Sequence, residues 1–346
     1  MGALRAERSG RRFRRARRLR GSPRGVAAVV GTLLALLVFF ALFGIFLTEY
    51  LPLWMTDNES QFTSQVDAAM ALFKSNVDVQ AALDGPTVYT TSFPISSDGV
   101  PLLAQPTEAT LVLLPTSCPM GFLANGAPIS KTSCVFEREA FTGGAGAKTN
   151  LGWNSTSTSS ILQVQLPNRY FNQQEFLFED DAEIQSQYNT FASIVSPPPL
   201  TIDKTSVNTT VSTSFLGLYG NATVVTGQGS EEVYSRLVTA STANSNGLFL
   251  SGSGKPVVFN FTFQIGTRNL CPWYNYVTGL VASAGLSAAG YSISWWNGVK
   301  TTTAPTTSVC LDSTGITYVL TLKVLNISFA SVVLSSFDIA MGVGVA

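Results

Sequence analysis

Four acidic residues stand close together in the chain, at Glu179, Asp180, Asp181 and Glu183. Carboxylate oxygens are the usual ligands of calcium, and two carboxyl groups about 5–9.5 Å apart can hydrolyse a glycosidic bond. The spacing is not that of an EF-hand, and a short acidic run is more commonly a solvated face. We therefore expect a solvated loop here, with a calcium site and a catalytic pair as the alternatives.

The chain contains no histidine. This excludes the Ser-His-Asp and Cys-His designs of many extracellular hydrolases and removes the imidazole as a metal ligand. The glycine-rich segments 143–146 and 227–229 lack the lysine of a phosphate-binding loop and are interpreted as turns. These observations favour a protein that is not an enzyme and needs no cofactor.

The adjacent aromatic residues Trp295 and Trp296 are candidates for ligand binding. An exposed aromatic face can serve as a platform for sugars, but large aromatic side chains also dominate the cores of β proteins. Adjacent residues of a strand face opposite ways, so one of the two would lie outside or under another element. Core packing is the preferred interpretation, and a glycan-binding platform is the alternative.

Four cysteines occur, and an even number in an oxidising compartment predicts two disulfides. Three pairings are possible, and proximity in the sequence favours Cys118 with Cys134 and Cys271 with Cys310. A zinc site is disfavoured, because the chain has neither a C-x-x-C pair nor a histidine.

The element that orients the whole chain is an uninterrupted apolar segment at 26–47. About 20 apolar residues suffice for a helix to cross a bilayer. The residues before it carry ten arginines and one acid, Glu7, and such basic flanks stay on the cytoplasmic side. We expect a basic cytoplasmic leader (1–25), one transmembrane helix (26–48) in contact with membrane lipid, and an extracellular remainder.

The exterior part is acidic and rich in acceptor sequences for N-glycosylation. Residues 26–346 hold eleven basic and twenty acidic residues, which excludes nucleic acid as a partner. Glycosylation of at least one acceptor and chance occurrence in a chain rich in Ser, Thr and Asn are equal alternatives. The acceptors are Asn58, Asn154, Asn208, Asn221, Asn260 and Asn326.

Two hydrophobic periods divide this exterior part. Residues 49–84 have apolar residues at helical spacing, from Phe62 to Val77, and predict a stalk that packs on the protein's own β-rich part or on neighbouring stalks. From residue 85 the period becomes two, as in 257–265 and 316–325. We expect a mainly β domain (85–346) of sandwich or jelly-roll type with one short helix and a candidate internal boundary near 197–201.

The junction Arg24-Gly25 before Val26 resembles the class III signal of archaeal type IV pilins and archaellins. In that family a membrane peptidase cuts before the apolar stretch, so the resemblance implies cleavage between Gly25 and Val26. It implies a prepilin-type peptidase and other pilin-like subunits as partners. Val30 stands where bacterial pilins carry an acid, which fits the archaeal branch.

Further stretches are similar to uncharacterised archaeal surface proteins with a pilin-like N-terminus and a β-rich exterior domain. They include YLPLWMTDNESQF, SDGVPLLAQPT and PNRYFNQQEFLFEDDAEI, within about the first 190 residues. The resemblance implies an architecture and no chemistry. The sequence thus predicts a single-pass cell-surface protein with a structural or adhesive role, as an accessory subunit of a pilus-like filament or as a permanent anchor. The alternative is a membrane-tethered module that binds surface glycans, or a carboxylate-dependent hydrolase.

Overall fold

A computed structural model describes most of the chain outside the leader. The described residues are 23–83, 85–114, 135–143, 153–187, 192–206, 208–244, 259–267, 269–296, 300–301, 303–306, 310 and 318–342. The chain forms two compact units, Met1–Trp54 and Met55–Ala346. Most of the predicted stalk therefore belongs to the same unit as the β-rich part, and residues 197–201 lie inside that unit.

The first unit consists of helix in its described part. It contains α1 (Pro23–Ile45) and a π-helical turn, η1 (Phe46–Tyr50), and the chain continues into α2 (Leu51–Leu83). Within the described residues this is the one helical stretch long and apolar enough to cross a membrane. The large apolar side chains of α1 are exposed, from Val29 to Ile45, so this surface requires lipid or other apolar helices to cover it.

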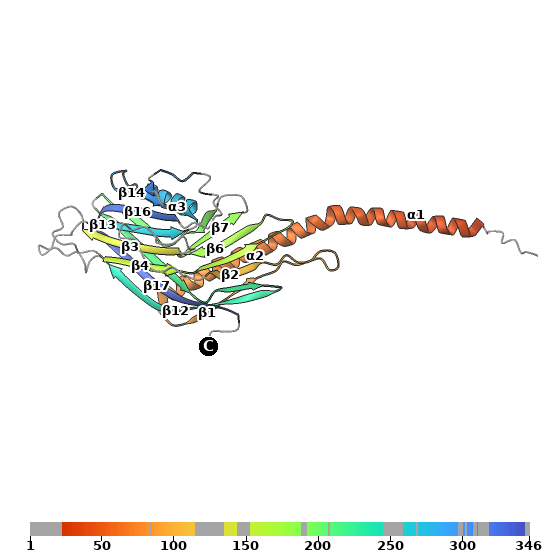
Figure 1. The fold of residues 1–346 in the computed structure, drawn as a ribbon, viewed down its shortest axis with the longest axis horizontal. Helices are drawn as coiled ribbons and strands as arrows, with labels where there is room; N and C mark the ends of the chain where they lie inside the picture. Colours follow the sequence, from red (N-terminus) through yellow and green to blue (C-terminus); the bar gives the residue numbers. More distant parts are fainter. Residues whose placement is uncertain are drawn as a thin grey trace, which may run out of the picture. The chain divides into compact units, whose positions relative to one another are not determined.

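The second unit contains three β-sheets in its described residues (Figure 1). Sheet 1 has, in spatial order, the strands β1 (Val88–Pro94), β12 (Ser230–Asn244), β17 (Phe329–Met341), β10 (Thr209–Tyr219) and β9 (Thr201–Lys204). Sheet 2 has β11 (Thr223–Thr226), β2 (Thr110–Leu114), β5 (Ile161–Leu166), β6 (Gln174–Glu179), β7 (Ala182–Gln187) and β8 (Ser193–Ser196). Sheet 3 has β15 (Lys300–Thr301), β14 (Tyr291–Trp296), β16 (Tyr318–Ile327), β13 (Phe259–Thr267), β3 (Val135–Gly143) and β4 (Trp153–Ser159). The pair β10 and β17 is parallel, and the other described pairs are antiparallel.

Helix α2 is built into the core of the second unit. Its buried face shares one hydrophobic cluster with sheet 2, through residues such as Phe178, and with sheet 1, through residues such as Phe337. The stripe that the helical spacing predicts is buried here, and it comprises Phe62, Val66, Ala69, Met70, Phe73 and Val77. The apolar face of the stalk therefore packs on the protein's own β-rich part.

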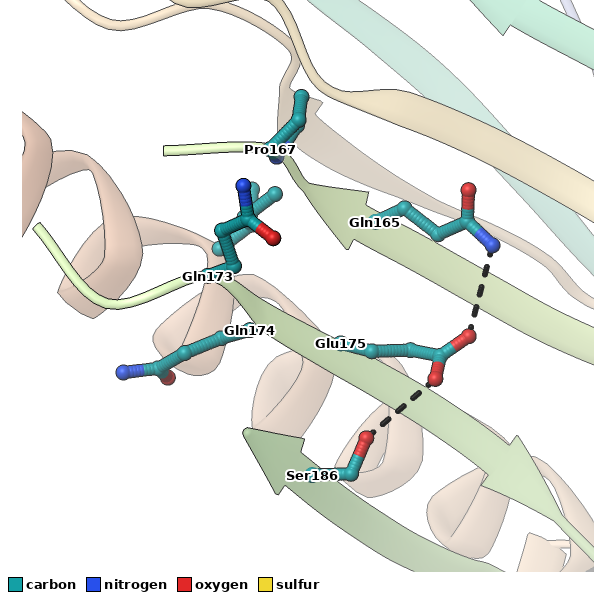
Figure 2. Close-up of a pocket in the computed structure, with 7 residues that line it drawn as sticks. Gln165, Pro167, Gln173, Gln174, Glu175 and Ser186 are labelled. Carbon is teal, nitrogen blue, oxygen red and sulfur yellow. Dashed lines mark hydrogen bonds between the residues drawn. The ribbon is translucent and has the colours of Figure 1, made fainter. Parts of the chain in front are cut away.

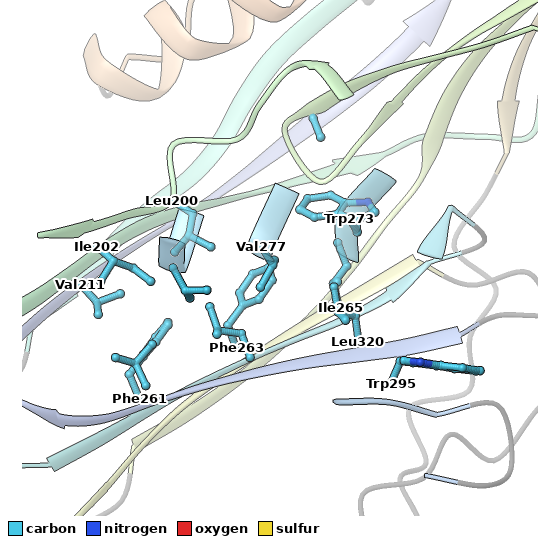
Figure 3. Close-up of a cluster of buried hydrophobic side chains, with 14 of the residues drawn as sticks. Leu200, Ile202, Val211, Phe261, Phe263, Ile265, Trp273, Val277, Trp295 and Leu320 are labelled. Atoms are coloured by element: carbon cyan, nitrogen blue, oxygen red, sulfur yellow. The ribbon is translucent and has the colours of Figure 1, made fainter. Parts of the chain in front are cut away.

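A second hydrophobic cluster surrounds the short helix α3 (Leu270–Ser283). Trp273 and Val277 of α3 lie over strand β13 of sheet 3, which carries Phe263 and Ile265 (Figure 3). Residues of sheet 1, such as Val211, and of sheet 2, such as Ile184, complete this core. The prediction of a mainly β fold with an N-terminal helix, a helical stalk and one short helix is confirmed.

Candidate functional site

The acidic run forms the tip of a hairpin rather than a solvated loop. Strands β6 and β7 are joined by Asp180 and Asp181, which both have positive φ angles of 48° and 62°. Asp is among the few residues that adopt this conformation, which a two-residue hairpin turn requires. The side chains of Glu179, Asp180, Asp181 and Glu183 are at most 2% exposed. The expectation of a solvated loop is wrong, because two helices cover the turn.

The hairpin separates its acids between these two helices. Glu179 pairs with Ala182 and Glu183 with Phe178, so the two glutamates leave the hairpin on opposite faces. On one face, Asn269 Nδ2 donates to Glu179 Oε2 at 2.9 Å, just before the start of α3. Among the described residues no three Asp, Glu, Cys or His side chains converge as a metal ion would require. The geometry therefore does not supply the calcium ligand set that remained an alternative.

On the other face, Lys74 of α2 reaches the turn. Its Nζ lies 2.6 Å from Asp181 Oδ1 and donates to the backbone oxygen of Asp181 at 2.7 Å. It also lies 3.5 Å from Asp78, one helical turn further along α2. Sequence reasoning missed Lys74, although a lysine between Phe73 and Val77 on the apolar stripe was a signal that its charge has a buried partner.

The burial of these acids shifts their titration. Desolvation, followed by repulsion from Glu179 and Asp181, raises the pKa of Asp180 well above its usual value. Desolvation and the charge of Asp67 raise the pKa of Glu183 to about 7, although Lys74 opposes this shift. Both Asp180 carboxyl oxygens lack a hydrogen-bond partner among the described residues. The hairpin tip is thus a buried polar centre in which uncharged carboxyl groups are favoured.

A second buried carboxylate holds the beginning of α2. Glu59 is fully buried, and Oε1 accepts hydrogen bonds from Arg169 N at 3.0 Å and Thr107 Oγ1 at 2.5 Å. Its Oε2 accepts from Tyr170 N and Phe171 N, each at 2.7 Å. Three consecutive backbone N–H groups therefore converge on one side chain. Sequence reasoning missed Glu59, which looks like an ordinary polar residue of a helix.

A small pocket opens on sheet 2 (Figure 2). It has a volume of about 250 Å³, and Gln165, Glu175 and Ser186 contribute amide, carboxylate and hydroxyl groups from three neighbouring strands. Gln165 Nε2 lies 3.5 Å from Glu175 Oε1, and Ser186 Oγ donates to Oε2 at 3.3 Å. Gln163 also donates to Glu175 Oε1. Groups of this kind bind hydroxylated ligands.

The two tryptophans do not form an open platform. Trp295 is 8% exposed, and its Nε1 donates to Thr303 O at 2.7 Å. Trp295 also packs edge-on against Tyr318, and Trp296 is half-buried. The preferred interpretation, core packing, is confirmed for Trp295.

One predicted disulfide is present in the described residues. Cys271, in the first turn of α3, is bridged to Cys310 with a Cα–Cα distance of 5.4 Å. Cys118 and Cys134 lie outside the described residues, so their pairing stays a prediction. Gly25 and Val26, the predicted processing site, belong to the first two turns of α1.

The predicted glycosylation acceptors differ in accessibility. Asn208, Asn221 and Asn326 are exposed. Asn58 is half-buried and donates to Asp98 O at 3.0 Å, and Asn260 is half-buried and accepts from Asn326 N at 3.3 Å. Asn154 lies on the edge strand β4. The exposed acceptors are the ones that a glycan can reach without rearrangement.

Comparisons of this chain with protein-family models, with curated proteins and with solved structures found no match.

Proposed function

We propose that this protein is a single-pass cell-surface protein with a structural or adhesive role, and that it serves as an accessory subunit of a type IV pilus-like filament. The helix would anchor the chain before assembly, and the β-rich part would be the extracellular head. A head of roughly 290 residues crowds a helical lattice, which favours an accessory position over that of a bulk subunit.

The exposed apolar surface of α1 is the observation that carries this proposal. The large side chains of the segment are between 38% and 68% exposed, and no charged residue interrupts the segment after Arg24. Helix α2, by contrast, buries its apolar stripe within its own unit. Lipid or the apolar helices of other subunits can cover such a segment. A pilin-type helix contacts lipid before assembly and the helices of other subunits in the filament.

Processing of the leader tests the proposal. We expect the mature protein from native membranes to begin at Val26 when a prepilin-type peptidase is active, and to keep its arginine-rich leader when the peptidase is inactive. Mass spectrometry of the N-terminal peptide measures both states. An intact leader in both samples would contradict the filament role and leave a permanently anchored surface protein.

A membrane-tethered glycan-binding module is the second candidate, and the pocket around Glu175 favours it. Its described lining has one carboxylate, whereas glycosidases use two, so binding fits better than hydrolysis. If sugars bind here, we expect Glu175→Ala to abolish selective binding on a glycan array. The exposed Glu232→Ala variant on β12 is the control and should bind as the wild type does. An array on which the wild type binds no glycan would rule this candidate out.

A further inference from the structure

The Lys74 ammonium and the Asp181 carboxylate form an ion pair that is almost closed to solvent. The Lys74 side chain is 9% exposed and that of Asp181 is 1% exposed. The 2.6 Å contact between Nζ and Oδ1 places the amine nitrogen directly beside the Asp181 carboxyl group. An amine and a carboxyl group are thus held where an amide bond could form.

Aromatic side chains surround this pair. The Phe178 ring centre lies 6.0 Å from Lys74 Nζ, and Phe73 packs edge-on against Phe178 with 5.3 Å between ring centres. Burial among such side chains disfavours the charged form of the Asp181 carboxyl group. Burial raises the pKa of the Asp181 carboxyl to about 7, although attraction to Lys74 opposes this shift. The neutral acid is the form that loses its hydroxyl group as water.

A third group lies beside both reactants. The Asp78 carboxylate is 3.5 Å from Lys74 Nζ, and its proximity to Asp181 contributes to the raised pKa of the Asp181 carboxyl. Its side chain is 45% exposed, so it can exchange protons with water. Other acids also face this centre: Glu179 and Asp180 at the hairpin tip, and Glu183 with Asp67 beside Lys74. Burial raises the pKa of Glu183 to about 7. Asp78 is therefore the residue placed to move protons between the amine and the leaving oxygen.

We propose that Lys74 and Asp181 condense to an intramolecular amide, with Asp78 as the acid–base group. The ammonium first gives a proton to the carboxylates, and the neutral Nζ then adds to Cγ of Asp181. The C–O bond breaks and the oxygen leaves as water, which carries two of the three ammonium protons. One ammonium and one carboxylate thus become one amide N–H, one carbonyl and one water, without oxidation or reduction. A pocket of about 350 Å³, lined by Lys74 and Asp78 among others, gives the water a way out.

This amide would join parts of the chain that are 107 residues apart. It would fix α2, which continues the membrane segment, to the β6–β7 hairpin in the middle of sheet 2. A cross-link over so long a loop restricts the unfolded chain, as a disulfide does, and resists reducing agents.

Peptide mapping of the full-length protein, purified in detergent and reduced, tests this inference. We expect trypsin to leave the Lys74 bond uncut, and a branched peptide that contains both Lys74 and Asp181 to have the mass of its two parts less one water. The Asp84-Gly85 and Asp98-Gly99 sequences can also lose water as succinimides, so fragment ions must show the branch. Cleavage after Lys74 and linear peptides of full mass in the folded protein would overturn the proposal.

Two variants separate the amide from an ordinary ion pair. Lys74→Arg keeps the positive charge, but a guanidinium is not a nucleophile at neutral pH, so the branched peptide should disappear. Asp78→Asn keeps both reactants and should lower the branched fraction of freshly folded protein at least several-fold. Asp57→Asn changes an exposed acid of the same helix and should leave that fraction unchanged. An unchanged branched fraction in Asp78→Asn would show that Asp78 is not the acid–base group.

Discussion

Replacement of Glu59 by alanine is expected to lower the free energy of unfolding by about 3–5 kcal/mol, as the loss of one partner of a buried charged group typically does. The variant leaves the backbone N–H groups of Arg169, Tyr170 and Phe171, and the Thr107 hydroxyl, without their acceptor. Hydrogen bonds to a charged group are worth about 1.5–3 kcal/mol each, and unpaired buried donors cost a similar amount. Denaturant unfolding followed by far-UV circular dichroism measures the difference.

Two further variants show that the loss comes from the carboxylate. Glu59→Gln keeps the shape of the side chain and one of its two acceptor oxygens. Its free energy of unfolding should therefore lie between those of the wild type and of Glu59→Ala. Asp57→Ala removes an exposed acid on the same helix and should stay within about 0.5 kcal/mol of the wild type. A loss of less than 1 kcal/mol in Glu59→Ala would mean that the loop of 167–173 holds its conformation without this side chain.

The apolar stripe of α2 shows what a periodic pattern predicts and what it does not. Phe62 to Val77 recur at the helical period, and the structure buries these residues as the pattern predicts. The pattern leaves open what covers them, because the partners lie on strands far away in the sequence. The same limit hides the roles of Glu59 and Lys74, because Arg169, which donates to Glu59, and Asp181, which pairs with Lys74, are more than 100 residues distant. A charged residue on a buried face is visible in the sequence, but its partner is not.

The strands were predictable where apolar residues alternate, and not where an edge strand is polar. Residues 316–325 cover most of β16, and residues 257–265 cover most of β13. Strand β4, with the sequence WNSTSTS, has little apolar alternation and forms an edge of sheet 3. Strand β7 was missed because the acids before it suggest a solvated loop.

Replacement of Asp180 by asparagine is expected to stabilise the protein at pH 8, by about 1–3 kcal/mol. The wild-type carboxyl has a raised pKa because of burial and repulsion from Glu179 and Asp181. An asparagine keeps the size and tolerates the positive φ of 48°. Its neutral amide removes the cost of a buried charge and can donate to the neighbouring carboxylates. Thermal or denaturant unfolding of both proteins at pH 8 measures the gain.

The same comparison as a function of pH tests the cause. The folded protein keeps a proton on Asp180 at pH values where the unfolded chain, with its ordinary pKa, releases it. The resulting stabilisation is complete below pH ~4 and is lost as the pH rises through the raised pKa of the folded state. Glu183, with a folded pKa of about 7, adds to the same pH dependence. We therefore expect the wild type to be more stable at pH 5 than at pH 8, and Asp180→Asn to flatten this slope. Asp203→Ala, on the exposed surface of β9, should keep the wild-type slope. Equal slopes in all three proteins would mean that the titration of Asp180 does not cause the pH dependence.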